Sequence, residues 1–119
     1  MKVSEYAALD ATGLAGLIRR KEISPQEVLD AAIEAIEQVN PSLNAIVART
    51  YDAARAQLAK GVDMNAPFCG VPFVIKDEGG LMKDIPCTLG TRLSGRGIVT
   101  DHDTILGARF KKAGVVVVA

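Results

Sequence analysis

The pattern of apolar and polar positions predicts a helical first half and a mixed second half. Residues 10–21 favour a first helix, which Asp10 or Thr12 caps. Residues 24–40 favour a longer second helix with one apolar face and one polar face. The apolar positions are Leu14, Leu17 and Ile18 in the first helix, and Val28, Leu29, Ala32, Ile33, Ile36 and Val39 in the second.

The second helix has the clearest start signal in the chain. Ser24 is a good N-cap, Pro25 follows at the first helical position, and Glu27 at the third completes a capping box. Asn40 and Pro41 predict the end of this helix, because proline cannot supply the amide that the helix needs.

Three further elements are expected between the second helix and residue 70. Residues 43–48 favour a short strand, and residues 51–60 a third helix that Gly61 closes. Residues 62–69 form a loop. We therefore expect a helical region over residues 1–61 and the start of a sheet core over residues 70–119.

The second half alternates strands with one helix. Residues 73–75 favour a strand that is buried on both faces. Residues 78–101 hold many turn residues and predict a long loop, which in a compact domain is usually functional or poorly ordered. Asp101 or Asp103 then caps a fourth helix, which Gly114 stops.

Four consecutive valines, Val115, Val116, Val117 and Val118, form the last predicted strand. They cannot alternate between core and solvent, so they need protein on both faces. The last residues of a domain normally lie at its surface. We therefore expect these residues to be part of a larger fold, or a partner to cover this edge.

Lys76 is the residue with the strongest candidate chemistry. It ends the apolar run 73–75, where we expect its side chain to lie half inside a core. Burial favours the neutral amine, which can accept a proton in catalysis. The alternative is a lysine that reaches water or forms an ion pair with Asp77 or Glu78, which could also orient it.

Composition limits the function classes. Lys and Arg together number 14, as do Asp and Glu, and aromatic residues make up 4% with no Trp. These values argue against binding to nucleic acid. No apolar run reaches the roughly 20 residues that cross a bilayer, and no secretory signal is visible at the N-terminus. We expect a cytoplasmic protein with Cys69 and Cys87 as reduced thiols.

Two other motifs are weak. Residues 90–97 have the glycine spacing of a phosphate-binding P-loop, but Arg96 and Gly97 replace its lysine and its hydroxyl residue. The run Asp101-His102-Asp103 contains the only histidine and fits the first turn of a helix better than a metal site. The sequence predicts no cofactor and no metal.

Several motifs in order resemble the N-terminal part of the amidase signature enzymes. They are the Ser-Pro-x-Glu-Val helix start, Val39-Asn-Pro-x-Leu-Asn-Ala, Gly70-Val-Pro-Phe-Val-Ile-Lys-Asp77, the Gly90-Thr-Arg loop, the Asp-His-Asp-Thr start of the fourth helix and the valine strand. The resemblance runs from about residue 9 to residue 119. It implies an α/β fold, of which this chain would be the N-terminal portion of a mixed sheet covered by helices.

The resemblance also implies a chemistry. In that family a Ser–cis-Ser–Lys triad hydrolyses carboxamides, and its lysine corresponds to Lys76. Both serines, and the glycine-rich oxyanion hole, belong to a segment after the valine strand, so this chain would carry only the lysine and would be inactive alone. The family usually has Asn and an apolar residue after Lys-Asp, where this chain has Glu78 and Gly79.

The expected partners follow from the same resemblance. They are a small-molecule amide substrate in the complete enzyme and the remainder of the amidase domain over the valine strand, with no nucleic acid and no membrane. A homo-oligomer is also compatible. Two alternatives stay open: a non-catalytic truncated or interaction module whose valine edge pairs with a partner, and a phosphate-binding α/β domain that uses residues 90–97.

Overall fold

The longest helix, α3 (Pro25–Leu43), begins as the sequence predicts and ends later. The Ser24 hydroxyl accepts from the Glu27 amide and the Glu27 carboxylate accepts from the Ser24 amide, so the capping box is confirmed. The predicted end at Asn40 and Pro41 is wrong. Pro41 lies inside the last turn, and the helix closes at Asn44, which takes φ 50° and donates to the Asn40 carbonyl at 2.7 Å.

The strand predicted over residues 43–48 does not form. The side chain of the buried Asn40 takes the place of a strand partner: its Oδ1 accepts from the Ile46 amide at 2.8 Å and its Nδ2 donates to the Ile46 carbonyl at 3.2 Å. Thr50 then ties the end of this segment to Val118 through a 3.0 Å backbone hydrogen bond. Hydrogen bonds between the Asn40 side chain and the Ile46 backbone thus take the place of the backbone pairing that a strand would make.

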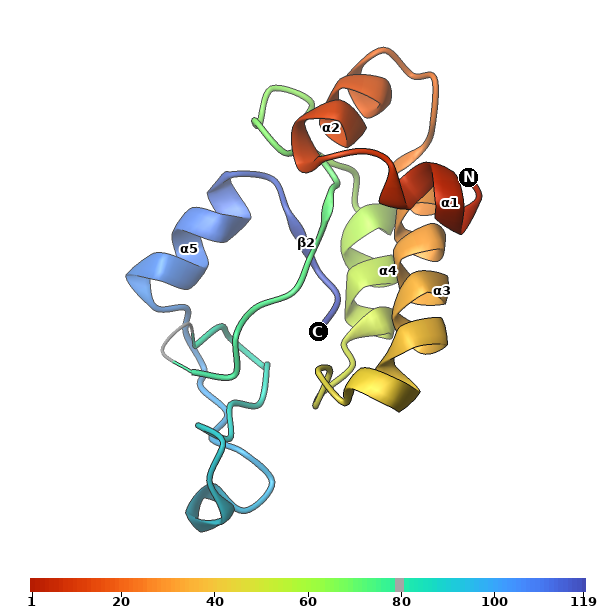
Figure 1. Cartoon of the computed structure of the whole chain (residues 1–119). Helices are drawn as coiled ribbons and strands as arrows, with labels where there is room; N and C mark the ends of the chain where they lie inside the picture. Colours follow the sequence, from red (N-terminus) through yellow and green to blue (C-terminus); the bar gives the residue numbers. More distant parts are fainter. Residues whose placement is uncertain (79–80) are drawn as a thin grey trace.

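Three shorter helices complete the first half of the chain. The first, α1 (Val3–Ala7), was not expected from the sequence. Asp10 caps α2 (Ala11–Arg19) by accepting from the Gly13 amide, as predicted. The predicted third helix is α4 (Tyr51–Ala59), and Gly61 follows it with φ 93°. Figure 1 shows α3 and α4 side by side, with α1 and α2 at one end of the molecule.

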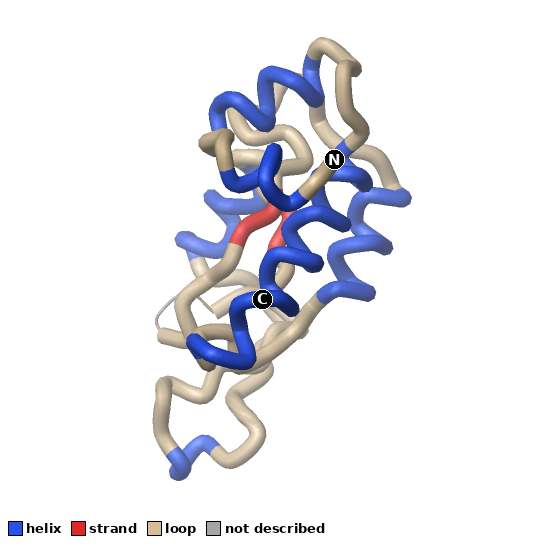
Figure 2. Tube along the Cα trace, turned by 45° about the vertical axis from the view of Figure 1, so that its right-hand side comes forward, coloured by secondary structure: helices blue, strands red, loops and turns tan. Residues whose placement is uncertain are grey.

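The sheet has two short parallel strands, β1 (Pro72–Phe73) and β2 (Val116–Val117). Pro72 pairs with Val116 and Phe73 with Val117. Figures 1 and 2 show the strands in the middle of the molecule, where α3 contacts β1 and α4 contacts β2. The computed structural model describes residues 1–78 and 81–119.

The predicted burial of the four valines is confirmed. Their exposed fractions are 6%, 1%, 7% and 1% from Val115 to Val118. One core cluster joins β2 to α3 and α4, and a second joins α2 and α3 to the turn before β1. On the far side of β1 from α3, the ring of Phe110 in α5 (Ile105–Lys112) lies 4.7 Å from the ring of Phe73. The chain is thus an α/β unit with helices around a sheet.

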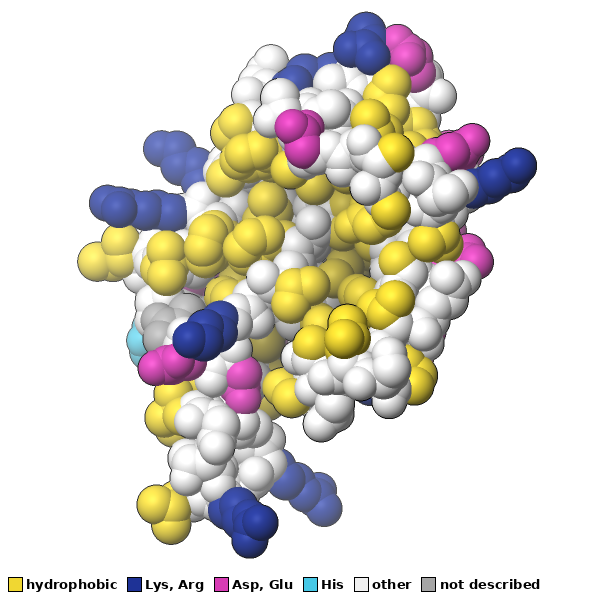
Figure 3. Space-filling model, in the orientation of Figure 1, with side chains coloured by type: hydrophobic (Ala, Val, Ile, Leu, Met, Phe, Trp, Pro, Cys, Tyr) yellow, Lys and Arg dark blue, Asp and Glu magenta, His cyan; other side chains and the backbone are white. Residues whose placement is uncertain are grey.

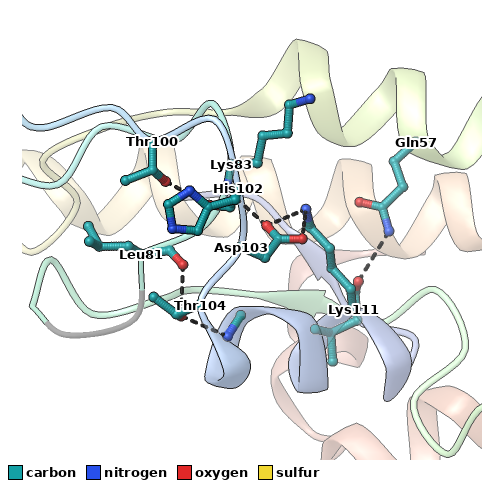
Figure 4. A network of polar contacts seen from close by, with 10 residues as sticks. Gln57, Leu81, Lys83, Thr100, His102, Asp103, Thr104 and Lys111 are labelled. Atoms are coloured by element: carbon teal, nitrogen blue, oxygen red, sulfur yellow. Dashed lines mark hydrogen bonds and ion pairs between the residues drawn. The ribbon is translucent and has the colours of Figure 1, made fainter.

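The start of α5 differs from the prediction. Thr104 is the N-cap, because its hydroxyl accepts from the Gly107 amide. The two predicted caps make other contacts. Asp101 pairs with His102, and Asp103 accepts hydrogen bonds from the Lys83 amide and the Lys111 ammonium. Figure 4 shows the contacts of Asp103 and Thr104, which fix α5 to the segment around Leu81. Gly114 ends the helix, as predicted, with φ 89°.

Candidate functional site

A turn at Gly70 leads into β1. Gly70 takes φ 77°, and its amide donates to the Gly114 carbonyl at 2.8 Å. A Cβ at Gly70 would lie 2.9 Å from the Cβ of Pro25, at the start of α3. Glycine is therefore required here both for its backbone angle and for the close approach of the helix.

The carboxyl ends of the two strands place Lys76 beside the end of β2. Beyond the paired residues, the Ile75 amide still donates to the Ala119 carbonyl at 3.0 Å. Lys76 is the next residue. In open α/β sheets, ligands bind outside the carboxyl ends of the strands. Lys76 thus lies at the edge of the sheet where an active site is expected.

The predicted burial of Lys76 is wrong in this structure. Its side chain is 81% exposed, and its Nζ lies 2.9 Å from the Glu78 carboxylate, which is itself 66% exposed. The physical reason is the short ladder: β1 ends at Phe73, and Val74 is already 47% exposed. An ion pair this exposed contributes at most about 1 kcal/mol and does not hold the amine firmly.

Lys76 lines a cavity of about 260 Å³ that the sequence did not reveal. Its walls come from residues 45–48, 74–77, 81–82 and 85–87 and from Ala119, and they are mostly apolar. Lys76 and Asp77 are the charged residues among those that line it. A mainly apolar pocket with a few polar groups is typical of a small-molecule site.

Asp77 does not pair with Lys76. Its carboxylate accepts hydrogen bonds from both the hydroxyl and the amide of Thr88. These two bonds hold the pKa of Asp77 below its usual value, and the bond from the hydroxyl has the larger effect. The role of Thr88 was missed at the level of sequence, because a contact across eleven positions of a turn-rich segment leaves no periodic signal.

The glycine-rich segment 90–97 does not have the geometry of a P-loop. Its only helical part is the 3₁₀ turn η1 (Arg92–Ser94), which Thr91 caps. A P-loop needs a preceding strand and a longer helix whose first amides face the phosphate. The hydroxyl of Ser94 instead donates to the carbonyls of Thr88 and Thr91.

The remaining candidates are engaged in structural contacts. The Asp103 carboxylate lies 2.7 Å from the Lys111 ammonium, and His102 Nδ1 lies 2.7 Å from Asp101. Across residues 1–78 and 81–119, no group of three or more His, Cys, Asp or Glu side chains is placed to hold a metal ion. Cys69 and Cys87 are both buried thiols.

Comparison with known proteins identifies the family. Residues 27–119 match the family model described as Amidase. The chain is 36% identical over 110 residues to the 6-aminohexanoate-cyclic-dimer hydrolase of Pseudomonas sp. (strain NK87), a match that covers 90% of this chain and 21% of that protein. It is 34% identical over 121 residues to fatty-acid amide hydrolase 2-A of Danio rerio, covering 91% of this chain and 22% of the relative.

Solved structures agree with the sequence matches. The structure of 6-aminohexanoate cyclic dimer hydrolase complexed with substrate superposes with a TM-score of 0.79 at 33% identity, over 93% of this chain and 23% of that one. The chain spans about a fifth of the length of the curated relatives it matches. The family model, the sequence identities and the superposition agree, and the chain belongs to the amidase signature family.

Proposed function

We propose that this chain is part of an amidohydrolase in which Lys76 carries the proton that the reaction must move. The observation that supports this most directly is that Lys76 lines a mainly apolar cavity beyond the carboxyl ends of two parallel strands. The relatives are named as hydrolases of the 6-aminohexanoate cyclic dimer and of fatty-acid amides. We extend from them the reaction class, cleavage of a carboxamide C–N bond.

The proposed mechanism uses two serines outside residues 1–119. The neutral amine of Lys76 accepts a proton from the middle serine, which in turn takes one from the nucleophilic serine. The nucleophile attacks the amide carbon, backbone amides stabilise the oxyanion, and the C–N bond breaks as the leaving amine takes the proton. Water then attacks the acyl-enzyme and releases the acid. No cofactor enters any of these steps.

This mechanism requires a cover over Lys76, since only the neutral amine has the lone pair that accepts a proton. A dry environment favours the neutral amine. Figure 3 shows apolar side chains gathered over the middle of the molecule, between α5 and α3. We propose that the part of the domain that carries the serines covers this region and the end of β2, and separates Lys76 from Glu78.

None of the helices in residues 1–78 and 81–119 has the length and apolar character of a membrane span.

The test is a pair of substitutions at Lys76 in the polypeptide that also carries the serines. Lys76→Arg keeps a cation beside Glu78 but cannot supply a neutral amine at working pH. We expect kcat to fall by about 10²–10⁴-fold in Lys76→Arg and in Lys76→Ala, as for the loss of a general base. The control is Lys83→Ala, at an exposed lysine, which leaves kcat unchanged.

Near-normal turnover in Lys76→Arg would contradict the proposed role. A second measurement uses residues 1–119 alone, mixed with a chromogenic anilide. We expect neither turnover nor an acylation burst, because the nucleophile is absent from this range. A burst stoichiometric with the purified chain would overturn the proposed division of the triad.

A further inference from the structure

The backbone around Lys76 is held on both sides. On one side, the Ile75 amide donates to the Ala119 carbonyl at 3.0 Å, which fixes residue 75 to the end of β2. On the other side, the Asp77 carboxylate accepts two hydrogen bonds from Thr88. Lys76 is the single residue between these two attachments.

Thr88 is itself firmly held, so it is a fixed point for Asp77. Its amide and hydroxyl donate to Asp77, its hydroxyl oxygen accepts from the Gly90 amide at 3.3 Å, and its carbonyl accepts from the Ser94 hydroxyl. Every polar group of Thr88 is therefore used.

The segment that contains Thr88 is closed at its base. Cys87 and Ile98 exchange two backbone hydrogen bonds, of 3.0 and 2.8 Å, in an antiparallel bridge. Residues 88–97 project beyond this bridge as a lobe, at the lower end of the molecule in Figure 1. Asp77 thus connects the segment that leads to Lys76 with the lobe 88–97, whose two ends are joined by the Cys87–Ile98 bridge.

We propose that Asp77 is a positioning residue: by clamping Thr88 it fixes the backbone from which Lys76 serves the reaction. This inference rests on the proposed function of Lys76 and adds to it a role for its neighbour. The Thr88 hydroxyl and then the Thr88 amide lower the pKa of the Asp77 carboxyl, because both hydrogen bonds favour its ionised form, and this direction agrees with the clamp.

A positioning role predicts a specific kinetic signature. A misplacement of about 1 Å in catalytic geometry costs about 10²-fold in rate. Lys76 moves protons and does not hold the substrate, so the loss falls on kcat and leaves KM within about twofold. A residue that merely shapes the pocket would change KM as well.

The experiment is a double-mutant cycle between Asp77→Ala and Thr88→Val, with Thr88→Ser as the matched control. All variants are made in the polypeptide that carries the serines. We expect Asp77→Ala to lower kcat by about 10- to 100-fold. Thr88→Val loses the hydroxyl and has a smaller effect, and Thr88→Ser keeps the hydroxyl and turns over at the parent rate.

The double variant decides whether the two residues act through each other. We expect it to be no slower than Asp77→Ala alone, because the clamp can be lost only once. Three outcomes would overturn the inference. They are additive losses of kcat in the double variant, a rise in KM that matches the fall in kcat, and a Thr88→Ser variant as slow as Thr88→Val. If Asp77→Ala fails to fold, the comparison of Thr88→Val with Thr88→Ser still decides.

Lys76→Arg, measured in the same series, separates this inference from the proposed function. If Lys76→Arg is inactive while the Asp77 and Thr88 variants keep the parent kcat, the clamp is refuted and the function stands. If Lys76→Arg is active, the proposed function itself fails, and the inference fails with it.

Discussion

The substitution Gly114→Ala probes the joint that sets the two strands side by side. Gly114 links α5 to β2 with φ 89°, a backbone angle that residues with a Cβ rarely adopt. Its carbonyl accepts from the Gly70 amide at 2.8 Å, so the joint also positions the turn before β1. A Cβ at this position would lie 2.6 Å from the Cβ of Ala66 and 3.3 Å from the amide nitrogen of Cys69.

Two costs add in this variant. A left-handed backbone costs an L-residue about 1–2 kcal/mol. Forcing an extra methyl group into a packed site costs about 1–3 kcal/mol more. The stiffer unfolded chain returns about 0.4–1 kcal/mol. We therefore expect Gly114→Ala to lower the free energy of unfolding by about 1–4.5 kcal/mol, with a central value of about 3 kcal/mol.

Gly61→Ala is the matched control. Gly61 has nearly the same backbone angle, φ 93°, but no described atom beyond its chain neighbours lies within 4 Å of the added Cβ. Gly61→Ala should lower the free energy of unfolding by the backbone cost alone, which is about 1 kcal/mol after the gain from the stiffer unfolded chain is subtracted. Urea unfolding followed by circular dichroism at 222 nm gives both values, provided that the slope with urea is unchanged.

The difference between the two variants isolates the steric cost against Ala66 and Cys69. Equal losses at Gly114 and Gly61 would refute the reasoning, since they would mean that the joint tolerates a methyl group. A larger loss at Gly61 would contradict it further.

Two other predictions concern the N-cap of α3 and the ion pair between Asp103 and Lys111. Ser24→Ala removes the side-chain cap of α3 and should cost about 1 kcal/mol in the same urea assay; an unchanged midpoint would show that the capping box is dispensable. Asp103→Asn tests a pH dependence. The hydrogen bond from Lys111, and then the Lys83 amide, lower the pKa of Asp103 in the folded chain. This carboxyl therefore adds stability above its unfolded pKa of about 4, which is lost as pH falls through the lower folded value. The parent should exceed Asp103→Asn in stability at pH 7 and match it near pH 2; parallel stability curves against pH would contradict this.

Local signals predicted the parts of the fold that local contacts decide. Ser24, Pro25 and Glu27 lie within one helical turn, so their spacing predicted the capping box that the structure contains. The valine run predicted its own burial for a similarly direct reason: without alternation it has no solvent face. Both inferences needed no knowledge of distant residues.

The predictions that were wrong concern places where a contact outside the local pattern determines the structure. The end of α3 and the missing strand over 43–48 both follow from Asn40, whose side chain binds Ile46 six residues later. Asp103 is a good cap by type, but Lys111 and the Lys83 amide occupy its carboxylate, and Thr104 caps α5 instead. A sequence pattern cannot rank such competing partners.

The candidate site was predicted in position but not in environment. The apolar run before Lys76 placed the lysine on the carboxyl side of β1, but β1 ends at Phe73, three residues before Lys76, and not at Ile75 as predicted. The expected burial of Lys76 assumed that the run was a full central strand, whereas the paired ladder is two residues long. The cavity and the Thr88 contact are made by segments 45–48 and 81–88, which meet Lys76 only through the tertiary fold.

The central claim is that the Lys76 amine moves a proton, and chemical rescue of Lys76→Gly tests it most directly. The polypeptide that carries the serines would be assayed with a chromogenic anilide in rising concentrations of small primary amines, with Lys83→Gly as the control. We predict that the amines restore leaving-group release in Lys76→Gly and that the rescued rate rises with the basicity of the amine. A rate that no amine restores, or that rises equally in the control, would contradict the account.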